Sequence, residues 1–445
     1  MQEVLILGAG MVASPMVKYL LDHSFAITLA DVDISKAIKI IDNHPNGKAK
    51  QIDANDEESI EKLASKVDLV VSLLPFAYHP KILKICIKLK KNMVTTSYLK
   101  PVMKEMEAQV KEAGIIMLNE VGVDPGIDHM SAMRLIDKIH DDGGEIIDFY
   151  SFCGALPAPE AINNPFKYRF SWSPRGVLLA GKNPATYKVE NKIIEVSAKK
   201  LFQDLRIIDF KGVGSLEVYP NRNSLEYIDL YGVSEATTVM RGTIRYPGWS
   251  AIIDSMKKLD LFSEEIVEIA GKTYADLLAE QMGVKNTDKL KLDLAAYLEI
   301  DVTSNVIVAL DYAGYFSNQP INKNTNSWFD ISADLMISKM ILNKSEKDMI
   351  VMMHCFKYKA SDGDIRFIKA TLKEFGDDKN TAVARTVALP AAISVRMILE
   401  GKIKLKGVFI PNIPEIYNPV LDELETMGIR MHEEFDCKEH SIRTI

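Results

Sequence analysis

The stretch VLILGAGMVA, residues 4–13, decides the fold class of this chain. An apolar run of strand length meets a Gly-x-Gly-x-x-Ala turn, and a helix-like stretch follows at once. Gly8 permits a tight turn, Gly10 has no side chain to keep a pyrophosphate from the backbone, and Ala13 lets the helix pack close to the strand. The free N–H groups at the start of that helix attract phosphate. Because these parts come in this order, we expect a βαβ unit that binds a dinucleotide.

The second predicted strand, residues 25–30, is followed by Asp31, which lies 21 residues after Gly10. An acid at that distance accepts hydrogen bonds from the adenosine ribose hydroxyls of NAD, and its charge repels the 2′-phosphate of NADP. Asp31 could instead cap the next helix, although Asp33 is better placed for that role. The spacing therefore predicts NAD as the preferred cofactor, and two nearby lysines keep NADP possible.

The composition is that of an ordinary globular protein of two or three domains. The chain has 445 residues, of which 47% are hydrophobic and 26% are charged, and its net charge is −7. No basic block occurs, so neither nucleic acid nor an anionic membrane is an expected partner. We also expect no secretory signal and no membrane span, because the first strand begins at once and no apolar stretch reaches the length of a span.

The four cysteines are scattered without a Cys-x-x-Cys pair, at Cys86, Cys153, Cys355 and Cys437. This usage fits a reducing compartment and argues against a zinc site. Neither a metal-ligand spacing nor the Ser/His/Asp arrangement of a hydrolase is readable in the chain. We therefore expect a cytoplasmic protein that holds no metal.

Residues 1–124 alternate apolar strands with amphipathic helices, which predicts an α/β fold with a Rossmann-type, doubly wound parallel sheet. Ligands of such sheets bind at the carboxyl ends of the strands. We therefore expect the segments 73–76, 97–98 and 119–124 to face the cofactor. The expected strands are 4–7, 25–30, 48–52, 67–73, 92–97 and 115–121, and the expected helices include 56–65, 80–90 and 101–113.

The pattern changes after residue 148. Short alternating stretches such as 192–196 and 225–231 predict an antiparallel sheet with one covered face. The segment 154–176 is long and irregular, as functional loops are. The remaining expectations are a mainly helical region over 251–341, a hairpin over 349–358 and 366–372, a helix over 381–399 and a final αβ segment.

Six ordered motifs go beyond periodicity. They are TTSY at 95–98, NEVGVDPGIDH at 119–129, FCGALPAPE at 152–160, FSWSPRG at 170–176, YPNR at 219–222 and RGTIRY at 241–246. Together they resemble the saccharopine dehydrogenases that form L-glutamate, also called saccharopine reductases. They also resemble the matching domain of the bifunctional lysine-degrading enzymes of plants and animals. The similarity runs over most of the chain.

The resemblance implies a fold of three parts and a homodimer. A dinucleotide domain over 1–124 is completed by the chain end, from about 390 to 445. A mixed α/β domain, 125–250 and about 345–390, carries substrate contacts and the dimer interface. A small helical insertion covers about 251–344.

The resemblance also implies a reversible oxidation of L-saccharopine in lysine metabolism. The secondary amine becomes an imine as hydride passes to the nicotinamide, water adds, and the carbinolamine breaks into L-glutamate and 2-aminoadipate 6-semialdehyde. Fungal biosynthetic relatives that use NADP tend to carry a basic residue where this chain has Asp31. On this point the chain resembles the NAD-using, lysine-degrading branch.

Saccharopine has three carboxylates, and guanidinium groups bind carboxylates in a bidentate manner. The resemblance assigns this role to Arg222 and Arg245, with Thr243 between them in the sequence. Ser97, Tyr98 and Asp124 complete the expected substrate ligands. The residues expected to contact the cofactor are Gly8, Gly10, Met11, Val12, Asp31, Leu74, Pro75, Ser97, Val123 and Ser173.

Imine hydrolysis requires proton transfers, for which Asp124, Cys153, Tyr98 and His129 are candidates. Asp124 or Asp128 could instead cap the helix that starts near residue 127. Cys153 is near the substrate by resemblance, although a lone cysteine is usually a small buried hydrophobe. His129 at a helix start is more often structural, and water could carry much of the proton traffic. The expected catalytic residues are therefore Asp124, Cys153 and Tyr98.

Two other classes of protein share parts of this pattern. A related amine or imine oxidoreductase, such as a carboxynorspermidine-type dehydrogenase or a lysine 6-dehydrogenase, has the same glycine loop and general fold. The two arginines at 222 and 245 and the Pro-Ala-Pro loop argue against that class. A regulator that binds NAD(P) without catalysis is compatible with the glycine loop, but it has no need of a substrate site.

Overall fold

The computed structural model describes residues 1–439, 443 and 444. The chain forms two compact units. Unit 1 contains residues 1–146, 358–365 and 370–434, and unit 2 contains residues 147–357, 366–369 and 435–445. The chain therefore passes between the units more than once. The three-part boundaries expected from the resemblance stay a prediction.

Unit 1 is built on a seven-stranded sheet in the order β15-β6-β5-β4-β1-β2-β3, and its paired strands are parallel. β1 pairs with β2 on one side and with β4 on the other, so the direction of winding reverses at β1. The expected α/β class and its parallel sheet are confirmed. The strands are β1 (Glu3–Leu7), β2 (Ala26–Asp31), β3 (Gly47–Gln51), β4 (Leu69–Ser72), β5 (Asn92–Thr95), β6 (Ile116–Leu118) and β15 (Gly407–Phe409).

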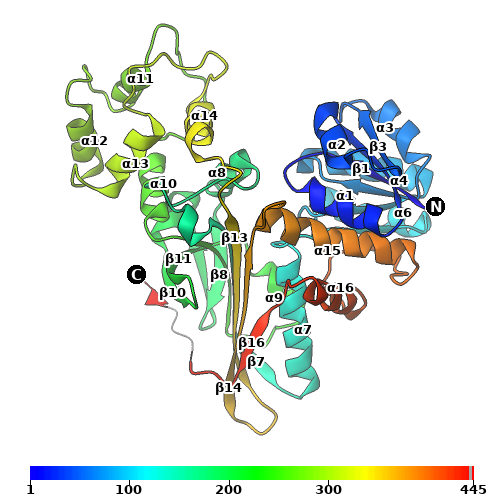
Figure 1. Cartoon of the computed structure of the whole chain (residues 1–445). Coiled ribbons are helices and arrows are strands. Elements are labelled where there is room, and N and C mark those ends of the chain that lie inside the picture. Colours follow the sequence, from blue (N-terminus) through cyan, green and yellow to red (C-terminus); the bar gives the residue numbers. More distant parts are fainter. Residues whose placement is uncertain (440–442, 445) are drawn as a thin grey trace. The chain divides into compact units, whose positions relative to one another are not determined.

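Helices pack around this sheet because their apolar faces match the buried strands, whose residues 4–7 and 69–72 are fully buried. The long helix α15 (Ala382–Leu399) contacts α1 and is drawn beside it in Figure 1. The other helices of unit 1 are α1 (Ala13–Asp22), α2 (Ile34–Ile41), α3 (Glu57–Ala64), α4 (His79–Leu89), α5 (Pro101–Lys104), α6 (Glu107–Glu112), α7 (Ile127–Asp141) and α16 (Pro414–Thr426).

α15 corrects the expectation that no apolar stretch of the chain reaches the length of a membrane span. By length and composition this helix could cross a membrane, but 83% of it is buried inside the structure. It contains Pro390 and still continues to Leu399, as the sequence predicted for the segment 381–399. Burial on this scale is typical of the core helix of a globular domain.

Unit 2 contains a mixed sheet with the order β13-β7-β12-β11-β10-β17. β7 and β12 run parallel, whereas β12, β11 and β10 pair antiparallel. The strands are β7 (Glu145–Pro157), β8 (Ala185–Val189), β9 (Lys192–Val196), β10 (Arg206–Phe210), β11 (Gly214–Pro220), β12 (Thr238–Arg245), β13 (Asp348–Lys359) and β17 (Arg443–Thr444). The neighbouring strands are β14 (Ile365–Phe375) and β16 (His432–Phe435), and like β7 and β13 they have residues in both units.

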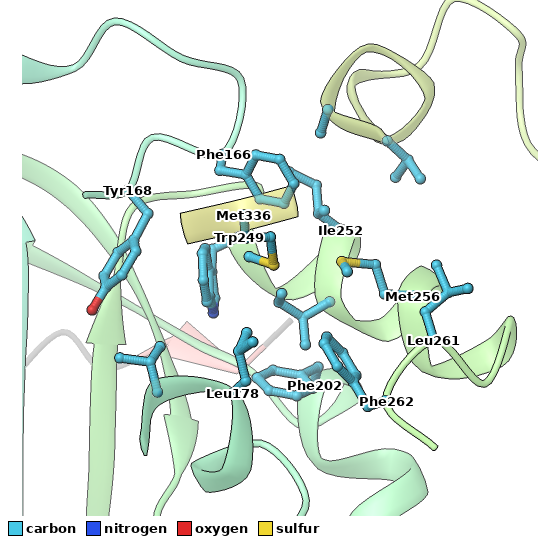
Figure 2. Packing of buried hydrophobic residues seen from close by; sticks show 14 of the residues in the cluster. Phe166, Tyr168, Leu178, Phe202, Trp249, Ile252, Met256, Leu261, Phe262 and Met336 are labelled. Atoms are coloured by element: carbon cyan, nitrogen blue, oxygen red, sulfur yellow. The ribbon is translucent and has the colours of Figure 1, made fainter. Parts of the chain in front are cut away.

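The region 251–341 is mainly helical, as predicted. Its helices form one core with the sheet of unit 2, and Figure 2 shows part of that core, where Trp249 lies beside Tyr168 and Phe166 with Met336 close by. The helices of unit 2 are α8 (Pro174–Ala180), α9 (Glu226–Tyr231), α10 (Trp249–Lys258), α11 (Tyr274–Gln281), α12 (Leu290–Leu298), α13 (Asn305–Ala313) and α14 (Trp328–Met340).

Three predicted elements differ from the structure. The predicted strand 225–231 is the helix α9, because Tyr227 and Tyr231 are buried at a spacing of four residues and Gly232 ends the helix with φ of 65°. The predicted helix 101–113 is divided into α5 and α6. The predicted strand 115–121 is reduced to β6, since the chain turns away after Leu118.

Candidate active site

The glycine loop between β1 and α1 has the geometry of a phosphate-binding turn. Gly8 has φ of 106°, and its N–H donates to the carbonyl of Ala30 at 2.8 Å. A Cβ on Gly8 would lie 3.1 Å from the backbone of Leu73, whereas a Cβ on Gly10 would meet no atom within 4 Å. Open space therefore borders the loop at Gly10, where the backbone and the start of α1 can receive a pyrophosphate.

The Asp31 carboxylate holds this loop in place. Its Oδ2 accepts the N–H of Ala9 at 2.7 Å, and its Oδ1 accepts the N–H of Asp33 at 2.9 Å. The capping role falls to Asp33, whose side chain accepts the N–H of Ser35 at the start of α2. The Asp31 side chain thus connects the end of β2 to the glycine loop.

A buried histidine links the ends of two neighbouring strands. His79, at the start of α4, places Nδ1 2.9 Å from the hydroxyl of Ser72 and Nε2 2.8 Å from the hydroxyl of Ser97. Ser72 ends β4, and Ser97 lies two residues after the end of β5. The side chain of Ser97, a predicted ligand of cofactor and substrate, is therefore oriented by an imidazole.

His79 is neutral at physiological pH. The residue is completely buried, and desolvation lowers the pKa of its imidazole to about 4. A neutral ring has one N–H, so it donates at one nitrogen and accepts at the other. The strand ends are thus joined without a charge.

Tyr98 and Asp124 are brought together although they lie far apart in the sequence. The Tyr98 hydroxyl donates to Oδ1 of Asp124 at 3.1 Å. The N-cap position of α7 is Gly126, whose N–H is accepted by Asp128 at 2.6 Å, so Asp124 is not the capping residue. A phenol bonded to a carboxylate can pass a proton between solvent and a reacting group.

His129, the fourth acid/base candidate, is bonded elsewhere. It is completely buried on the first turn of α7, and its Nε2 lies 2.8 Å from Oε2 of Glu120. Glu120 is itself 7% exposed. His129 is thus bonded to a buried carboxylate of the protein.

The remaining predicted cofactor residues of unit 1 lie around the same strand ends. Met11 is 50% exposed beside the glycine loop, and Val12 precedes α1. Leu74 and Pro75 follow β4, and Val123 is buried in the loop after β6. Their contacts with a cofactor stay a prediction.

In unit 2, three predicted residues cluster on adjacent strands. Thr243 of β12 is the register partner of Cys153 on β7 and of Tyr219 on β11. Arg245 ends β12 two residues later. Cys153 is buried, as expected for a lone cysteine.

Arg245 is a buried cation among aromatic rings. It is 4% exposed, and its guanidinium carbon lies 5.1 Å, 5.7 Å and 5.9 Å from the ring centroids of Tyr168, Trp249 and Tyr219. Nη1 donates to the carbonyl of Ile244 at 2.8 Å. Among the described residues no carboxylate pairs with it, and its Nε has no hydrogen-bond partner. Glu217, its register partner on β11, favours the charged guanidinium electrostatically but forms no ion pair with it. A buried cation without an ion pair favours the binding of an anion.

Trp249 begins α10 beside this guanidinium. Its Nε1 is also buried without a hydrogen-bond partner in the described part of the chain. The buried carboxylate of Glu217 accepts the N–H groups of Gly248 at 3.0 Å and Ser250 at 2.6 Å, and so anchors the first turn of α10. Glu217 therefore serves the helix and holds Trp249 in place.

The other two predicted residues of unit 2 are exposed. Arg222 is exposed in the loop after β11, with φ of 54°. Ser173 is exposed as the N-cap of α8, where its hydroxyl accepts the N–H of Gly176 at 3.2 Å. Their expected ligand contacts stay predictions. Within residues 1–439, 443 and 444, no group of three His, Cys, Asp or Glu side chains is placed to hold a metal.

Sequence reasoning missed four residues of these clusters: His79, Glu120, Tyr168 and Trp249. A single buried histidine or tryptophan has no distinguishing pattern in the sequence, because its partners are brought to it by the fold. Glu120 lay inside a quoted motif, but nothing local showed that its carboxylate is buried.

Two protein-family domains match the chain. The saccharopine dehydrogenase NADP binding domain matches residues 4–118, and the saccharopine dehydrogenase C-terminal domain matches residues 122–429. The chain belongs to the saccharopine dehydrogenase family. This confirms the resemblance carried by the six motifs.

Relatives of the family match over the whole chain. The saccharopine dehydrogenase [NADP(+), L-glutamate-forming] of Schizosaccharomyces pombe is 35% identical over 98% of this chain and 99% of its own length. The mitochondrial alpha-aminoadipic semialdehyde synthase of Rattus norvegicus is 36% identical over 96% of this chain, which corresponds to 47% of that protein. The solved apo saccharopine dehydrogenase (L-Glu forming) from Saccharomyces cerevisiae has a TM-score of 0.89 at 34% identity, covering 98% of this chain and 100% of that chain.

The prediction of NAD as the preferred cofactor is wrong. The relatives from S. pombe and S. cerevisiae, matched over their whole length, are named as NADP(+) forms, and the domain that matches residues 4–118 is an NADP binding domain. The physical reason lies in the bonds of Asp31. Its carboxylate oxygens accept the amides of Ala9 and Asp33, so an acid at this spacing has a role in the loop whichever cofactor binds, and its presence does not by itself select against NADP.

Proposed function

We propose that this protein is a glutamate-forming saccharopine dehydrogenase that uses NADP. It oxidises L-saccharopine with NADP⁺ and water to L-glutamate and 2-aminoadipate 6-semialdehyde, and the reaction is reversible. The observation that carries the proposal is the buried Arg245, which has no ion-pair partner among the described residues, in a chain whose full-length relatives are named for this reaction. Such a cation is suited to a substrate with three carboxylates.

We assign substrate binding to the arginines and to Thr243. Arg245 binds one carboxylate in surroundings that exclude water, which strengthens the interaction. Arg222 is exposed and reaches a second carboxylate more weakly. The Thr243 hydroxyl lies two residues from Arg245 on β12 and supplies a neutral hydrogen bond.

The proton transfers are assigned to Tyr98 and Asp124. A bound NADP⁺ would supply the hydride acceptor for the carbon beside the secondary amine. The nitrogen loses its proton as the C=N bond forms, and water then adds to that carbon. As the carbon–nitrogen bond breaks, the nitrogen gains a proton and leaves as the amine of glutamate. The hydrogen-bonded Tyr98–Asp124 pair supports this assignment, because it can donate and accept the protons at the nitrogen.

The glycine loop supplies the cofactor site. The open space at Gly10 and the start of α1 suit the pyrophosphate, and Ser97 offers a hydroxyl at the end of β5. Asp31 contributes by fixing the loop through the N–H of Ala9. Cys153 is kept as a neighbour of the substrate by its register with Thr243.

We further propose a cytoplasmic homodimer that needs neither a metal nor nucleic acid. Within the described part of the chain, Cys86, Cys153, Cys355 and Cys437 form no disulfide, which supports a reducing compartment. The related imine oxidoreductases and a non-catalytic regulator are not favoured, since the full-length relatives are named glutamate-forming saccharopine dehydrogenases. Sedimentation of the purified protein tests the dimer.

The test of function is nicotinamide reduction by the purified protein with L-saccharopine and NADP⁺, with glutamate measured as a product. We expect saccharopine-dependent reduction, glutamate formed in equal amount to NADPH, and slower turnover with NAD⁺. Reduction without glutamate release would point to a related amine oxidoreductase. Tight NADP binding without any reduction would overturn the enzymatic assignment.

A further inference from the structure

Glu120 brackets Tyr98 with two hydrogen bonds. Its own N–H donates to the carbonyl of Ser97 at 3.1 Å, and its Oε1 accepts the N–H of Leu99 at 2.8 Å. These two contacts fall on the residues immediately before and after Tyr98. The loop that carries the Tyr98 phenol is therefore attached to the segment after β6 on both sides of that residue.

The second carboxylate oxygen of Glu120 is bonded to the helix that follows Asp124. Oε2 lies 2.8 Å from Nε2 of His129 on α7, and both side chains are buried. The turn that contains Asp124 is joined to the same helix, since the N–H of Asp128 donates to the carbonyl of Val123 at 3.0 Å. One carboxylate thus connects the element that carries Tyr98 with the element that fixes Asp124.

The backbone of Glu120 indicates that this arrangement is maintained against a local preference. Its φ of 61° lies in the left-handed region, which is unfavourable for a residue with a side chain. A buried carboxylate also requires hydrogen bonds to offset its lost hydration. A strained, buried acid whose bonds end on both sides of Tyr98 is a sign of a functional constraint.

We propose that Glu120, held by His129, is a positioning residue that keeps the Tyr98 hydroxyl at the Asp124 carboxylate. In this role it acts through Tyr98 and not on the reacting atoms. This inference rests on the proposed function, in which Tyr98 and Asp124 exchange the protons of the reaction. A carboxylate that only stabilised the fold would have no reason to act through that hydroxyl.

A double-mutant cycle with Tyr98→Phe tests the proposal. Glu120→Met removes both acceptors at similar volume, and we expect kcat to fall about tenfold or more, as for Tyr98→Phe itself, with an unchanged Kd for NADPH. In the Tyr98→Phe background the same change should lower kcat less than about twofold, because the hydroxyl to be positioned is already gone. Glu120→Gln, which keeps the acceptor for Leu99, should restore most of the activity.

The outcomes are distinguishable. Equal losses of kcat from Glu120→Met in both backgrounds would overturn the positioning role while leaving the proposed function intact. Full activity of Tyr98→Phe would remove the role of Tyr98 and, with it, this inference, although saccharopine-dependent reduction would still stand. His129→Gln replaces Glu120→Met should that variant not fold, and we expect a smaller loss of kcat that again vanishes in the Tyr98→Phe background.

Discussion

The polar clusters of the two units differ in how far their groups are satisfied. In unit 1, His79 and Glu120 have partners at both ends: the imidazole lies between Ser72 and Ser97, and the carboxylate between Leu99 and His129. In unit 2, Arg245 is equally buried but has no ion-pair partner, and its neighbour Trp249 has an unpaired N–H within the described part of the chain. The buried polar groups named in unit 1 have their partners within the protein, whereas Arg245 and Trp249 in unit 2 have polar atoms without one among the described residues.

This difference suits the two sets of residues to different tasks: satisfied networks orient other side chains, and an unpaired cation binds an anion. Satisfied networks rigidify the hydroxyls and carboxylates that they hold, because each group already has its preferred partner. An unpaired buried cation lowers stability, and the protein recovers that free energy when an anion binds. Within the proposed function, we therefore assign orientation of the reacting groups to the strand ends of unit 1 and anchoring of a carboxylate to Arg245.

The strongest way to break this comparison is to remove the unpaired cation. For Arg245→Met we expect kcat/KM for saccharopine to fall about 100- to 1,000-fold, or about 3–4 kcal/mol, because a buried charge interaction with the substrate is lost. The melting temperature should not fall, since no ion pair of the free protein is broken. Steady-state kinetics and thermal unfolding measure the two effects.

Arg169 provides the matched control within unit 2. It is also buried, but it pairs with Glu346 at 3.0 Å and donates to the carbonyl of Lys339 at 2.7 Å. Arg169→Met should therefore destabilise the protein by about 3–5 kcal/mol with little change in kcat/KM below the unfolding temperature. If both variants lose stability alike and keep their kinetics, Arg245 is a structural residue.

His79 sharpens the comparison through its pH dependence. Burial lowers its pKa from 6.5 to about 4, so the unfolded chain binds more protons between these values and stability falls as the pH drops through that range. The loss reaches at most about 3 kcal/mol near pH 4 and is absent above about pH 7. Denaturant unfolding of the wild-type chain and His79→Gln across this range should show the dependence only in the former. If the free energy of unfolding depended on pH in the same way for the wild-type chain and for His79→Gln, the fold would not keep His79 neutral.

Gly8→Ala probes the rigid part of the cofactor loop. The φ of 106° and a Cβ position 3.1 Å from the backbone of Leu73 require the loop to shift. We expect a loss of about 1–3 kcal/mol in the free energy of unfolding, together with weaker NADP binding. Chemical denaturation without ligand gives the first quantity and fluorescence titration with NADPH the second. A fully stable variant would contradict the role of the turn as a fixed element.

Gly10→Ala should have the smallest effect on the free protein. An added Cβ meets nothing within 4 Å, so we expect a stability change below about 0.5 kcal/mol. The Kd for NADP should still rise about tenfold, because the methyl group occupies the space in which the backbone receives the pyrophosphate. An unchanged Kd would place the pyrophosphate elsewhere along the loop.

Much of unit 1 was predictable because its signals are local. An apolar strand followed at once by a glycine turn and a helix permits few arrangements, and hydrophobic periodicity located β4 and β5 within the predicted strands 67–73 and 92–97. The error at α9 has a related cause. Alternating apolar residues over 225–231 suggested a strand, but burial of Tyr227 and Tyr231 selects the helix.

The cofactor prediction failed because spacing locates a residue without showing what it bonds. Asp31 lies where an acid commonly contacts ribose, yet the fold directs its carboxylate to the N–H of Ala9. That bond joins residues 22 positions apart and has no signature in either segment.

The sequence by itself determined the parallel sheet, the glycine loop, the order of the motifs and therefore the family. Which polar groups meet depends on the tertiary structure: His79 with Ser97, Glu120 on both sides of Tyr98, and Arg245 with aromatic rings and, among the described residues, no ion-pair partner. The physical reason is that periodicity records which face of an element is buried. A hydrogen-bond partner is chosen by the packing of elements that are distant in the chain.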